Sequence, residues 1–293
     1  MGAAVLPGAS RLRLGPHEWD IRHRALVMGI LNRTPDSFFD RGSYFSFDAF
    51  LERAASLVAA GADILDVGGV KAGPGAEVTA AEELERVVPA VEALAARFDV
   101  ALSVDTWRAE VAAAAFAAGA VLGNDISGFA DPAYLPAAAA SGAGVVATHI
   151  RLAPRVPDPD PVYGDLLAEV GSFLAERAAR AVAAGVAPES VLLDAGLDLG
   201  KTASQSLALL RASDLLATGG YPVLLSASNK TFLGALLSLE ITERRDASLV
   251  AASIGIWLGC RVLRVHDVAG TRRVRDTLAA VLAAHPGAVA GDR

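Results

Sequence analysis

The residues of this chain that are best suited to chemistry lie at the ends of short apolar runs. Eight β-type runs can be counted, and each finishes in polar or glycine residues. If the runs are the parallel strands of one barrel, their carboxyl ends form a single mouth. Carboxylates, amides and cations meeting there would suit a flat polar heterocycle that carries an anionic group. These residues are Asn32, Asp66 with Gly68 and Gly69, Asp105, Asn124 with Asp125, His149, Asp194, Ser228 to Lys230, and Arg264 with His266.

Arg264 and His266 form the most basic of these strand ends. They are two positions apart, so on a strand their side chains point to the same side. Two neighbouring cationic or potentially cationic groups indicate a phosphate or pyrophosphate site. The alternative is an arginine packed over the rim beside a hydrogen-bonded core histidine, and for an isolated pair this alternative is favoured.

Asp105 and Asp194 each end a run that is otherwise apolar. A buried carboxylate needs hydrogen-bond donors to stay ionised. Those donors are either backbone N–H groups and a neighbouring lysine, or the N–H edge of a ligand. For either aspartate alone, both interpretations stay open.

The eight runs predict parallel strands. They repeat about every 34 residues, close to the length of a strand–helix–strand unit. They are almost continuously apolar, as expected for strands buried on both faces of a parallel sheet. The runs are Ala25–Asn32, Asp63–Gly69, Ala101–Thr106, Val121–Ser127, Gly144–Ile150, Val191–Leu197, Pro222–Ser228 and Val262–Asp267.

Helical patterns lie between these runs. Thr79 and Glu82 form a T-x-x-E capping box at the start of one helix, and Pro89 within it predicts a kink. Amphipathic stretches indicate further helices at Ala49–Ala60, Arg108–Ala118, Leu166–Ala184 and Arg272–Ala284.

Alternating strands and helices over this length predict a single-domain (β/α)8 TIM barrel of the α/β class. A doubly wound open sheet is the alternative, but no G-x-G-x-x-G follows the first strand. We expect an N-terminal extension over residues 1–20, the barrel over 21–285 and a C-terminal tail over 286–293. The segment Ala153–Pro161 is expected to be a long loop after the fifth strand.

Composition and charge exclude several kinds of protein. The chain has 293 residues and a hydrophobic fraction of 53%, which is typical of a folded protein rather than a disordered one. Its formal charge is −7 and it has no basic cluster, so nucleic acid is not an expected partner. A single cysteine, Cys260, excludes internal disulfides and agrees with a reducing cytoplasmic location. No signal peptide is expected.

Mean hydropathy is +0.41, which raises the question of a membrane. The longest weakly polar runs, Val111–Gly123 and Ala247–Cys260, have 13 and 14 residues. Both are shorter than the roughly 18 apolar residues that a membrane-spanning helix needs. We therefore expect buried helices or strands in these runs and no membrane partner.

Taken together, seven segments resemble the dihydropteroate synthase family, in order along most of the chain. The first two resemble the two signatures of that family. The segments are Met28–Gly42 (MGILNRTPDSFFDRG), Asp66–Ala76 (DVGGVKAGPGA), Ser103–Thr106 (SVDT), Asn124–Gly128 (NDISG), Asp194–Thr202 (DAGLDLGKT), Ser228–Gly234 (SNKTFLG) and Arg264–Val268 (RVHDV).

This resemblance implies a TIM barrel, homodimeric and cytoplasmic, that condenses 6-hydroxymethyl-7,8-dihydropterin pyrophosphate with p-aminobenzoate and releases pyrophosphate. It further implies that four residues bind the pterin. The carboxylates would accept hydrogen bonds from the amino and ring N–H groups, and the lysine would donate to the ring acceptors. These residues are Asp105, Asn124, Asp194 and Lys230.

The resemblance also implies roles around the pyrophosphate and the second substrate. Asn32 would ligate the Mg²⁺ that neutralises the pyrophosphate, and Arg264 with His266 would bind its oxygens. Ser228 matches a serine near the aminobenzoate. Such a reaction needs no covalent nucleophile, because stabilising the departing pyrophosphate lets the C–O bond break before the arylamine attacks.

The second-substrate half departs from the family pattern. The family reads G-G-E-S-T-R-P-G in the second loop, where Gly68–Gly75 reads GGVKAGPG. Lys71 is the candidate to replace the lost positive charge at the substrate, although a lysine lacks the bidentate fork of arginine. The departures are Ala72 for threonine, Gly73 and Asn229 for arginines, Leu199 for an aromatic residue, and Arg33 for a small aliphatic residue.

Three functions are consistent with this pattern. The leading hypothesis is a dihydropteroate synthase, impaired or with an altered second substrate. The second is a non-catalytic paralogue that binds a pterin or pterin pyrophosphate. A pterin-binding methyltransferase domain is the least favoured, because R-V-H-D-V and the T-P-D-S-F loop belong to the pyrophosphate-using family.

Overall fold

Eight parallel strands form the centre of the fold, in a computed structural model that describes residues 8–33, 45–71, 73, 75 and 77–284. The strands are β3 (Leu26–Asn32), β4 (Ile64–Gly68), β5 (Ala101–Asp105), β6 (Leu122–Asp125), β7 (Gly144–Thr148), β8 (Val191–Asp194), β9 (Val223–Leu225) and β10 (Cys260–Val265). They close into a barrel in the order β10-β3-β4-β5-β6-β7-β8-β9. The predicted TIM barrel is confirmed, and each predicted run overlaps one strand.

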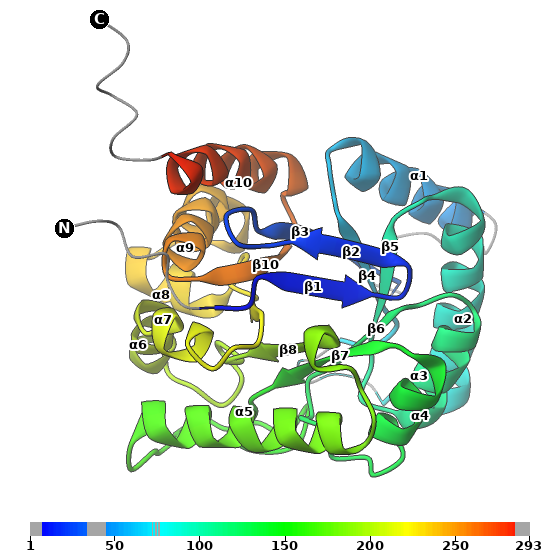
Figure 1. Ribbon diagram of the computed structural model, residues 1–293, viewed down its shortest axis with the longest axis horizontal. Helices are drawn as coiled ribbons and strands as arrows, with labels where there is room; N and C mark the ends of the chain where they lie inside the picture. The colour runs from blue at the N-terminus through cyan, green and yellow to red at the C-terminus, as the bar shows by residue number, and fades with distance from the viewer. Residues whose placement is uncertain (1–7, 34–44, 72, 74, 76, 285–293) are drawn as a thin grey trace, which may run out of the picture.

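Helices surround the barrel (Figure 1). The capping box at Thr79 and Glu82 is formed, and Pro89 lies inside the helix that it begins. All five predicted helices are present, whereas α4 and α6 to α9 below were not predicted. The helices are α1 (Phe45–Ala59), α2 (Ala80–Arg97), α3 (Ala109–Ala117), α4 (Tyr134–Ser141), α5 (Leu166–Ala183), α6 (Ala203–Arg211), α7 (Ser213–Ala217), α8 (Thr231–Leu237), α9 (Arg245–Trp257) and α10 (Val268–Ala283), with 3-10 turns η2 (Pro188–Ser190) and η3 (Ile241–Glu243).

The barrel interior changes from apolar to polar along the strands. Near the amino-terminal ends, a separate apolar cluster includes Leu26, Met28, Ile64, Ala101, Leu122, Val146, Leu192, Leu224 and Val262. Side chains of a strand alternate between its two faces, so the next interior residue lies two positions further on. On six of these strands that residue is polar, namely Asp66, Ser103, Asn124, Thr148, Asp194 and Arg264.

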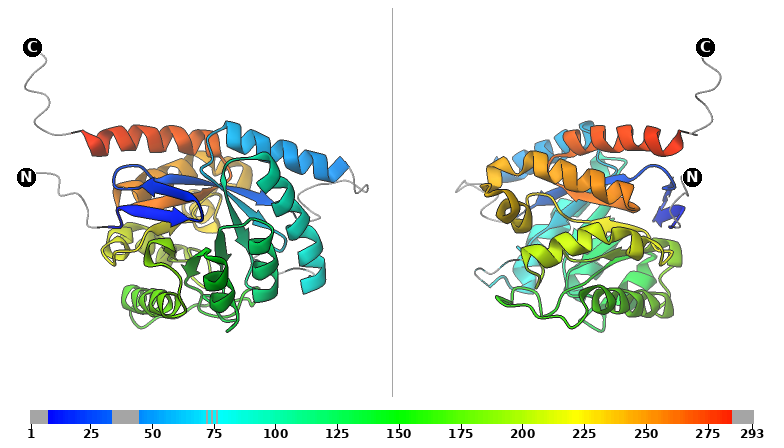
Figure 2. Two further views of the ribbon diagram at one scale, coloured as in Figure 1. Left: turned by 45° about the vertical axis from the view of Figure 1, so that its right-hand side comes forward. Right: turned by 90° about the vertical axis from the view of Figure 1, so that its left-hand side faces the viewer.

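A hairpin closes the amino-terminal end of the barrel (Figures 1 and 2). It consists of β1 (Arg11–Leu14) and β2 (His17–Asp20), paired antiparallel. Leu12 and Leu14 of the hairpin, with Ile21 beyond it, are fully buried in the same cluster as the interior residues. The expected N-terminal extension therefore contributes to the core.

The outer face of α9 corrects one prediction. The run Ala247–Cys260 was expected to be buried, but three of its large apolar side chains are exposed. Val250 is 58% exposed, Ile254 40% and Trp257 56%. The prediction that this run is buried is wrong, because α9 packs only one of its faces on the barrel wall. Ala251 and other small residues lie on that face.

The predicted long loop is present, and the lengths of the helices bear on the question of a membrane. Ala153–Pro161 contains neither helix nor strand and follows β7, the fifth barrel strand, as predicted. None of the helices within the described ranges has both the length and the apolar character to cross a bilayer.

Candidate active site

Four sequence-predicted positions form one row across neighbouring strands at the carboxyl end of the barrel. Asn32 of β3 pairs with Gly68 of β4, Gly68 with Asp105 of β5, and Asp105 with Asn124 of β6. A Cβ at Gly68 would lie 3.1 Å from Asn32 Oδ1 and 3.7 Å from Asp105 Oδ2. Glycine at this position therefore leaves room between the amide and the carboxylate.

Asp66 lies one interior layer below this row and organises it. The residue is fully buried. Its carboxylate accepts hydrogen bonds from Ser103 Oγ at 2.6 Å, Asn124 Nδ2 at 3.2 Å and Arg264 Nε at 2.6 Å. The sequence placed Asp66 among the strand ends but gave it no role. Its spacing of two from Gly68, on the same face of β4, was the signal.

Arg264 joins two carboxylates across the barrel. Besides its bond to Asp66, its Nη2 atom donates to Asp105 Oδ2 at 2.6 Å. Burial raises the pKa of Asp105 to about 7, and Arg264 opposes that rise. Although burial works against it, the charges of Asp66 and Asp105 raise the pKa of Arg264. The guanidinium expected to bind pyrophosphate thus pairs with Asp105, one of the carboxylates expected to bind pterin, and with Asp66.

Asp194 and Lys230 form the opposite side of the mouth. Asp194 ends β8 and its Oδ1 accepts a hydrogen bond from the Gly196 N–H at 2.8 Å. Lys230 Nζ donates to the Leu197 carbonyl at 2.5 Å. Burial raises the pKa of Asp194, which Lys230 opposes, and burial lowers the pKa of Lys230, which Asp194 opposes. The pair offers both an acceptor and a donor to a ligand.

Lys201 and His149 support the loop after β8. Lys201 Nζ lies 2.9 Å from His149 Nδ1 and donates to the Gly196 carbonyl at 2.9 Å. Burial lowers the pKa of Lys201 to about 7, and burial with the charge of Lys201 lowers that of His149 to about 3. Sequence reasoning gave neither residue a role. A lysine seven residues after the strand-ending aspartate, at the end of the motif DAGLDLGK, was the available signal.

Ser228 and His266 meet where β9 and β10 end. Ser228 Oγ lies 3.0 Å from His266 Nδ1 and accepts from the His266 backbone N–H at 3.2 Å. Desolvation by the surrounding protein, with the charges of Arg264 and Arg53, lowers the pKa of His266 to about 4. The histidine is therefore neutral at physiological pH in this arrangement.

The second loop is open at its altered position. No heavy atom of the described chain lies within 4 Å of a Cβ built at Gly73, and the backbone there is not left-handed. Lys71, the candidate replacement for the lost charge, is exposed in the same loop. Ala72 lies outside the described residues, as does most of the first loop.

Arg33 departs from the family pattern without entering the mouth. Its Nη1 donates to the Arg86 carbonyl of α2 at 3.0 Å, and its guanidinium lies 4.6 Å from the centre of the Phe47 ring of α1. Burial, with the charge of Arg86, lowers the pKa of Arg33. The side chain is thus a link between α1 and α2.

Asn229 sits in a left-handed conformation between Ser228 and Lys230, with φ of 58°. Its N–H donates to Ser248 Oγ at 3.0 Å, and its carbonyl accepts from Arg244 Nη1 at 3.1 Å. Asparagine tolerates this conformation better than most residues with a side chain. The turn that presents Ser228 and Lys230 is therefore anchored to α9 and the residue before it.

The oxygen atoms of the side chains at the mouth are of the kind that binds magnesium. Mg²⁺ prefers hard oxygen ligands and is often held by one or two protein groups together with substrate phosphates. Asn32 offers an amide oxygen 3.1 Å from a Cβ built at Gly68, on the strand next to Gly68 and across it from Asp105. Within the described ranges, no three His, Cys, Asp or Glu side chains gather as a metal site. A magnesium site at Asn32 would therefore depend on oxygen atoms of the bound substrate for its other ligands.

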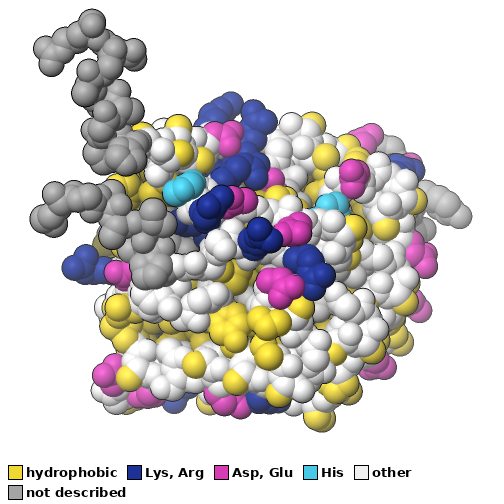
Figure 3. Space-filling view, viewed as in Figure 1, with side chains coloured by type: hydrophobic (Ala, Val, Ile, Leu, Met, Phe, Trp, Pro, Cys, Tyr) yellow, Lys and Arg dark blue, Asp and Glu magenta, His cyan; other side chains and the backbone are white. Residues whose placement is uncertain are grey.

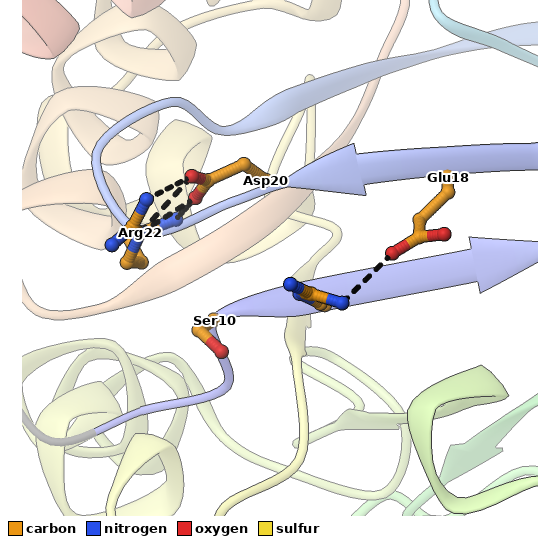
Figure 4. Close-up of a pocket in the computed structure, with 5 residues that line it drawn as sticks. Ser10, Glu18, Asp20 and Arg22 are labelled. Atoms are coloured by element: carbon orange, nitrogen blue, oxygen red, sulfur yellow. Dashed lines mark hydrogen bonds and ion pairs between the residues drawn. The ribbon is translucent and has the colours of Figure 1, made fainter.

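A hollow of about 520 Å³ at the hairpin differs from the mouth (Figure 4). Its charged side chains bond to one another, Arg11 to Glu18 at 3.3 Å and Arg22 to Asp20 at 2.5 Å. On this face, basic and acidic side chains are interspersed (Figure 3). These pairs are exposed and lie at the amino-terminal end of the barrel, which in this fold serves stability rather than catalysis.

Comparison with known proteins shows which family this chain is similar to. The pterin binding enzyme family matches residues 28–266. A Mycobacterium leprae protein named "Inactive dihydropteroate synthase 2" is 46% identical over 269 residues, covering 90% of this chain and 92% of that protein. The Escherichia coli dihydropteroate synthase is 41% identical, covering 88% and 92%. The Xanthomonas albilineans dihydropteroate synthase, solved with 4-aminobenzoic acid, has a TM-score of 0.87 at 38% identity, covering 94% and 99%.

Proposed function

The chain belongs to the dihydropteroate synthase family of pterin-binding enzymes, and we propose that it is a transferase of this type. It condenses 6-hydroxymethyl-7,8-dihydropterin pyrophosphate with p-aminobenzoate to give 7,8-dihydropteroate and pyrophosphate. The observation that carries the proposal is the set of buried and half-buried acceptors and donors at the strand ends, Asp105, Asn124, Asp194 and Lys230.

The pterin is recognised by complementary hydrogen bonds. Its amino and ring N–H groups need acceptors, which Asp105 and Asp194 supply, and its ring oxygen and nitrogen acceptors need a donor, which Lys230 supplies. Burial makes each of these bonds specific, because a ligand lacking the partner leaves a buried polar group unpaired. Asp66 fixes Asn124 and Arg264 beside the pocket.

The leaving group determines the chemistry. His266 and Arg264 lie at the end of β10, where negative charge on the departing pyrophosphate needs stabilisation. Without a ligand, the lowered pKa of His266 makes its ring neutral at physiological pH. A phosphate oxygen beside the ring would raise this pKa and favour the protonated form, because a nearby negative charge stabilises the imidazolium. Mg²⁺ at Asn32 would add charge neutralisation when it is bound. The arylamine then attacks the carbon from which pyrophosphate has left.

Condensation is slowed in this chain. The pterin side is held by ion pairs of Arg264 with Asp66 and Asp105, whereas Gly73 supplies no side chain in the loop where the family carries arginine. A glycine also makes this loop more costly to order over a substrate. A second candidate, a pterin-binding protein without condensation activity, is favoured by the same open loop.

The protein acts as a cytoplasmic homodimer in this proposal. Large apolar side chains are exposed on α8, η3 and α9, which are consecutive along the chain. Patches of this kind mark surfaces that another protein covers. Sedimentation velocity at micromolar concentration tests the dimer, and Trp257→Glu should shift it to monomer. The exposed residues are Leu236, Leu237, Ile241, Val250 and Trp257.

One experiment separates the two candidate functions. Calorimetry measures binding of pterin pyrophosphate, and chromatography then measures product after p-aminobenzoate and Mg²⁺ are added. We expect tight pterin binding and slow formation of 7,8-dihydropteroate. Binding without any product would favour the non-catalytic candidate, and absence of pterin binding would overturn both.

A further inference from the structure

Lys201 is a buried cation whose hydrogen-bond partners, within the described ranges, are backbone carbonyls and a histidine ring. It is 7% exposed and lies just before α6. Besides its contacts with His149 Nδ1 and the Gly196 carbonyl, its Nζ donates to the Leu199 carbonyl at 3.0 Å. An ammonium carries three N–H donors, and these three acceptors use all of them. The imidazole of His149 then accepts through Nδ1 and keeps its proton on Nε2.

The loop after β8 takes its shape around this cation. It contains neither helix nor strand, and three of its residues are left-handed, Gly196 with φ of 64°, Asp198 with 65° and Gly200 with 60°. The chain therefore turns back on itself, and the carbonyls of Gly196 and Leu199 converge on one atom, Lys201 Nζ. Converging carbonyl oxygens repel each other, whereas a cation between them turns that repulsion into attraction.

The same loop contacts both members of the pair proposed to bind the pterin. A backbone N–H of the loop holds the Asp194 carboxylate, and the carbonyl of Leu197 holds the Lys230 ammonium. Asp198 Oδ2 also accepts from the backbone N–H of Thr231 at 2.5 Å, directly after Lys230 in the chain. The loop thus fixes the head group of Lys230 and the backbone beside it. Its shape sets the spacing between the acceptor and the donor that face the ligand.

We propose that Lys201 is a positioning residue for pterin recognition, which acts through the loop after β8 on Asp194 and Lys230. Its loss lets the converging carbonyls separate, so the acceptor and the donor no longer match the edge of the pterin. The effect falls on the pterin and not on the leaving group, because His266 and Arg264 lie on β10. This inference rests on the proposed function, since the pterin is the first substrate of that reaction.

The test measures binding of 6-hydroxymethyl-7,8-dihydropterin to the full chain by calorimetry. Lys201→Met keeps the length of the side chain and removes its charge, so Kd should rise about tenfold, as expected for misplaced binding groups. Lys201→Arg keeps the charge and should lose less, because Lys201 lines a cavity of about 220 Å³ that has room for a larger head group. Arg211→Met, on the exposed last turn of α6, is the matched control and should leave Kd unchanged.

A double-mutant cycle separates positioning from a general structural role. If Lys201 acts through the pair, Lys201→Met should raise Kd only about threefold in an Asp194→Asn background, because the acceptor that it positions is already lost. Circular dichroism checks folding, and Lys201→Gln replaces Lys201→Met in the cycle if the methionine variant is unfolded. Equal fold-losses in both backgrounds, or an effect below twofold in the unchanged background, would overturn the inference. Absence of pterin binding to the unchanged chain would overturn the proposed function instead.

Discussion

The pterin side and the second-substrate side of the mouth are built differently. On the pterin side, side chains from β4, β5, β6 and β10 are locked together by buried bonds of 2.6 to 3.2 Å around Asp66. On the other side the groups come from loops, and among the described residues no heavy atom lies within 4 Å of a Cβ built at Gly73. Strands fix a binding geometry, whereas loops tolerate change. Divergence in this chain is accordingly concentrated in the loops.

The difference also has an energetic side. A change at Asp66 or Arg264 leaves a buried charge without its partner, which costs several kcal/mol. A change at Gly73 removes no side chain, and a Cβ built there meets no heavy atom of the described residues within 4 Å. Pterin recognition is thus tied to the stability of the barrel, while second-substrate recognition is free to vary at little cost in stability.

The largest effect is expected for Arg264→Ala. Its loss leaves Asp66 buried with one donor fewer and Asp105 without its ion-pair partner. The free energy of unfolding should fall by about 3–5 kcal/mol, and binding of both the pterin alcohol and its pyrophosphate should fall together. Urea unfolding and calorimetry measure the two effects.

His266→Ala is the matched control for that prediction. His266 makes no bond to the pterin-side carboxylates, so its loss should weaken the pyrophosphate ester more than the alcohol. An Arg264→Ala protein that keeps its stability and loses only the pyrophosphate ester would show that Arg264 serves the leaving group alone.

A smaller effect is expected for Asp194→Asn. The amide presents donors to ligand donors and keeps the shape of the side chain, so pterin affinity should fall about 10- to 100-fold, as for a lost hydrogen bond to a charged group. Calorimetry with the pterin alcohol measures it, and Asp158→Asn is the control for removing a carboxylate from outside the mouth. Unchanged affinity would make Asp194 a structural residue.

The fold and much of the site were predictable from the sequence, for physical reasons. Short apolar runs that recur about every 34 residues indicate buried parallel strands, and polar residues at their ends mark the mouth. The hairpin was missed because Arg11–Leu14 is short and alternates with charged residues. The bond from Arg264 to Asp66 spans 198 positions in sequence, and only barrel closure brings the two together. No local pattern carries that information.

Acidity should control pterin binding on this side of the mouth. Because burial raises the pKa of Asp105 to about 7, the group is mostly protonated at pH 6 and mostly ionised at pH 8. Ligand N–H donors need the ionised form, so pterin affinity should rise about tenfold over that range. Asp105→Asn should be weaker and flat with pH. A rise that persists in this variant would point to Lys201, whose pKa is also about 7.

The smallest effect is expected from repairing the second loop. For Gly73→Arg with Ala72→Thr, stability should stay within about 0.5 kcal/mol, because a Cβ at Gly73 meets no described heavy atom within 4 Å and the backbone there is not left-handed. Asn229→Arg is less suitable, since the left-handed conformation at 229 would be strained for arginine. Gly73→Arg should raise the condensation rate about two- to threefold, because arginine offers two parallel N–H bonds to a carboxylate or phosphate and glycine offers none. Initial rates of 7,8-dihydropteroate formation measure the gain. An unchanged rate in a variant that still binds pterin pyrophosphate would mean that the second loop does not limit condensation, and Leu199 would then be the next position to test.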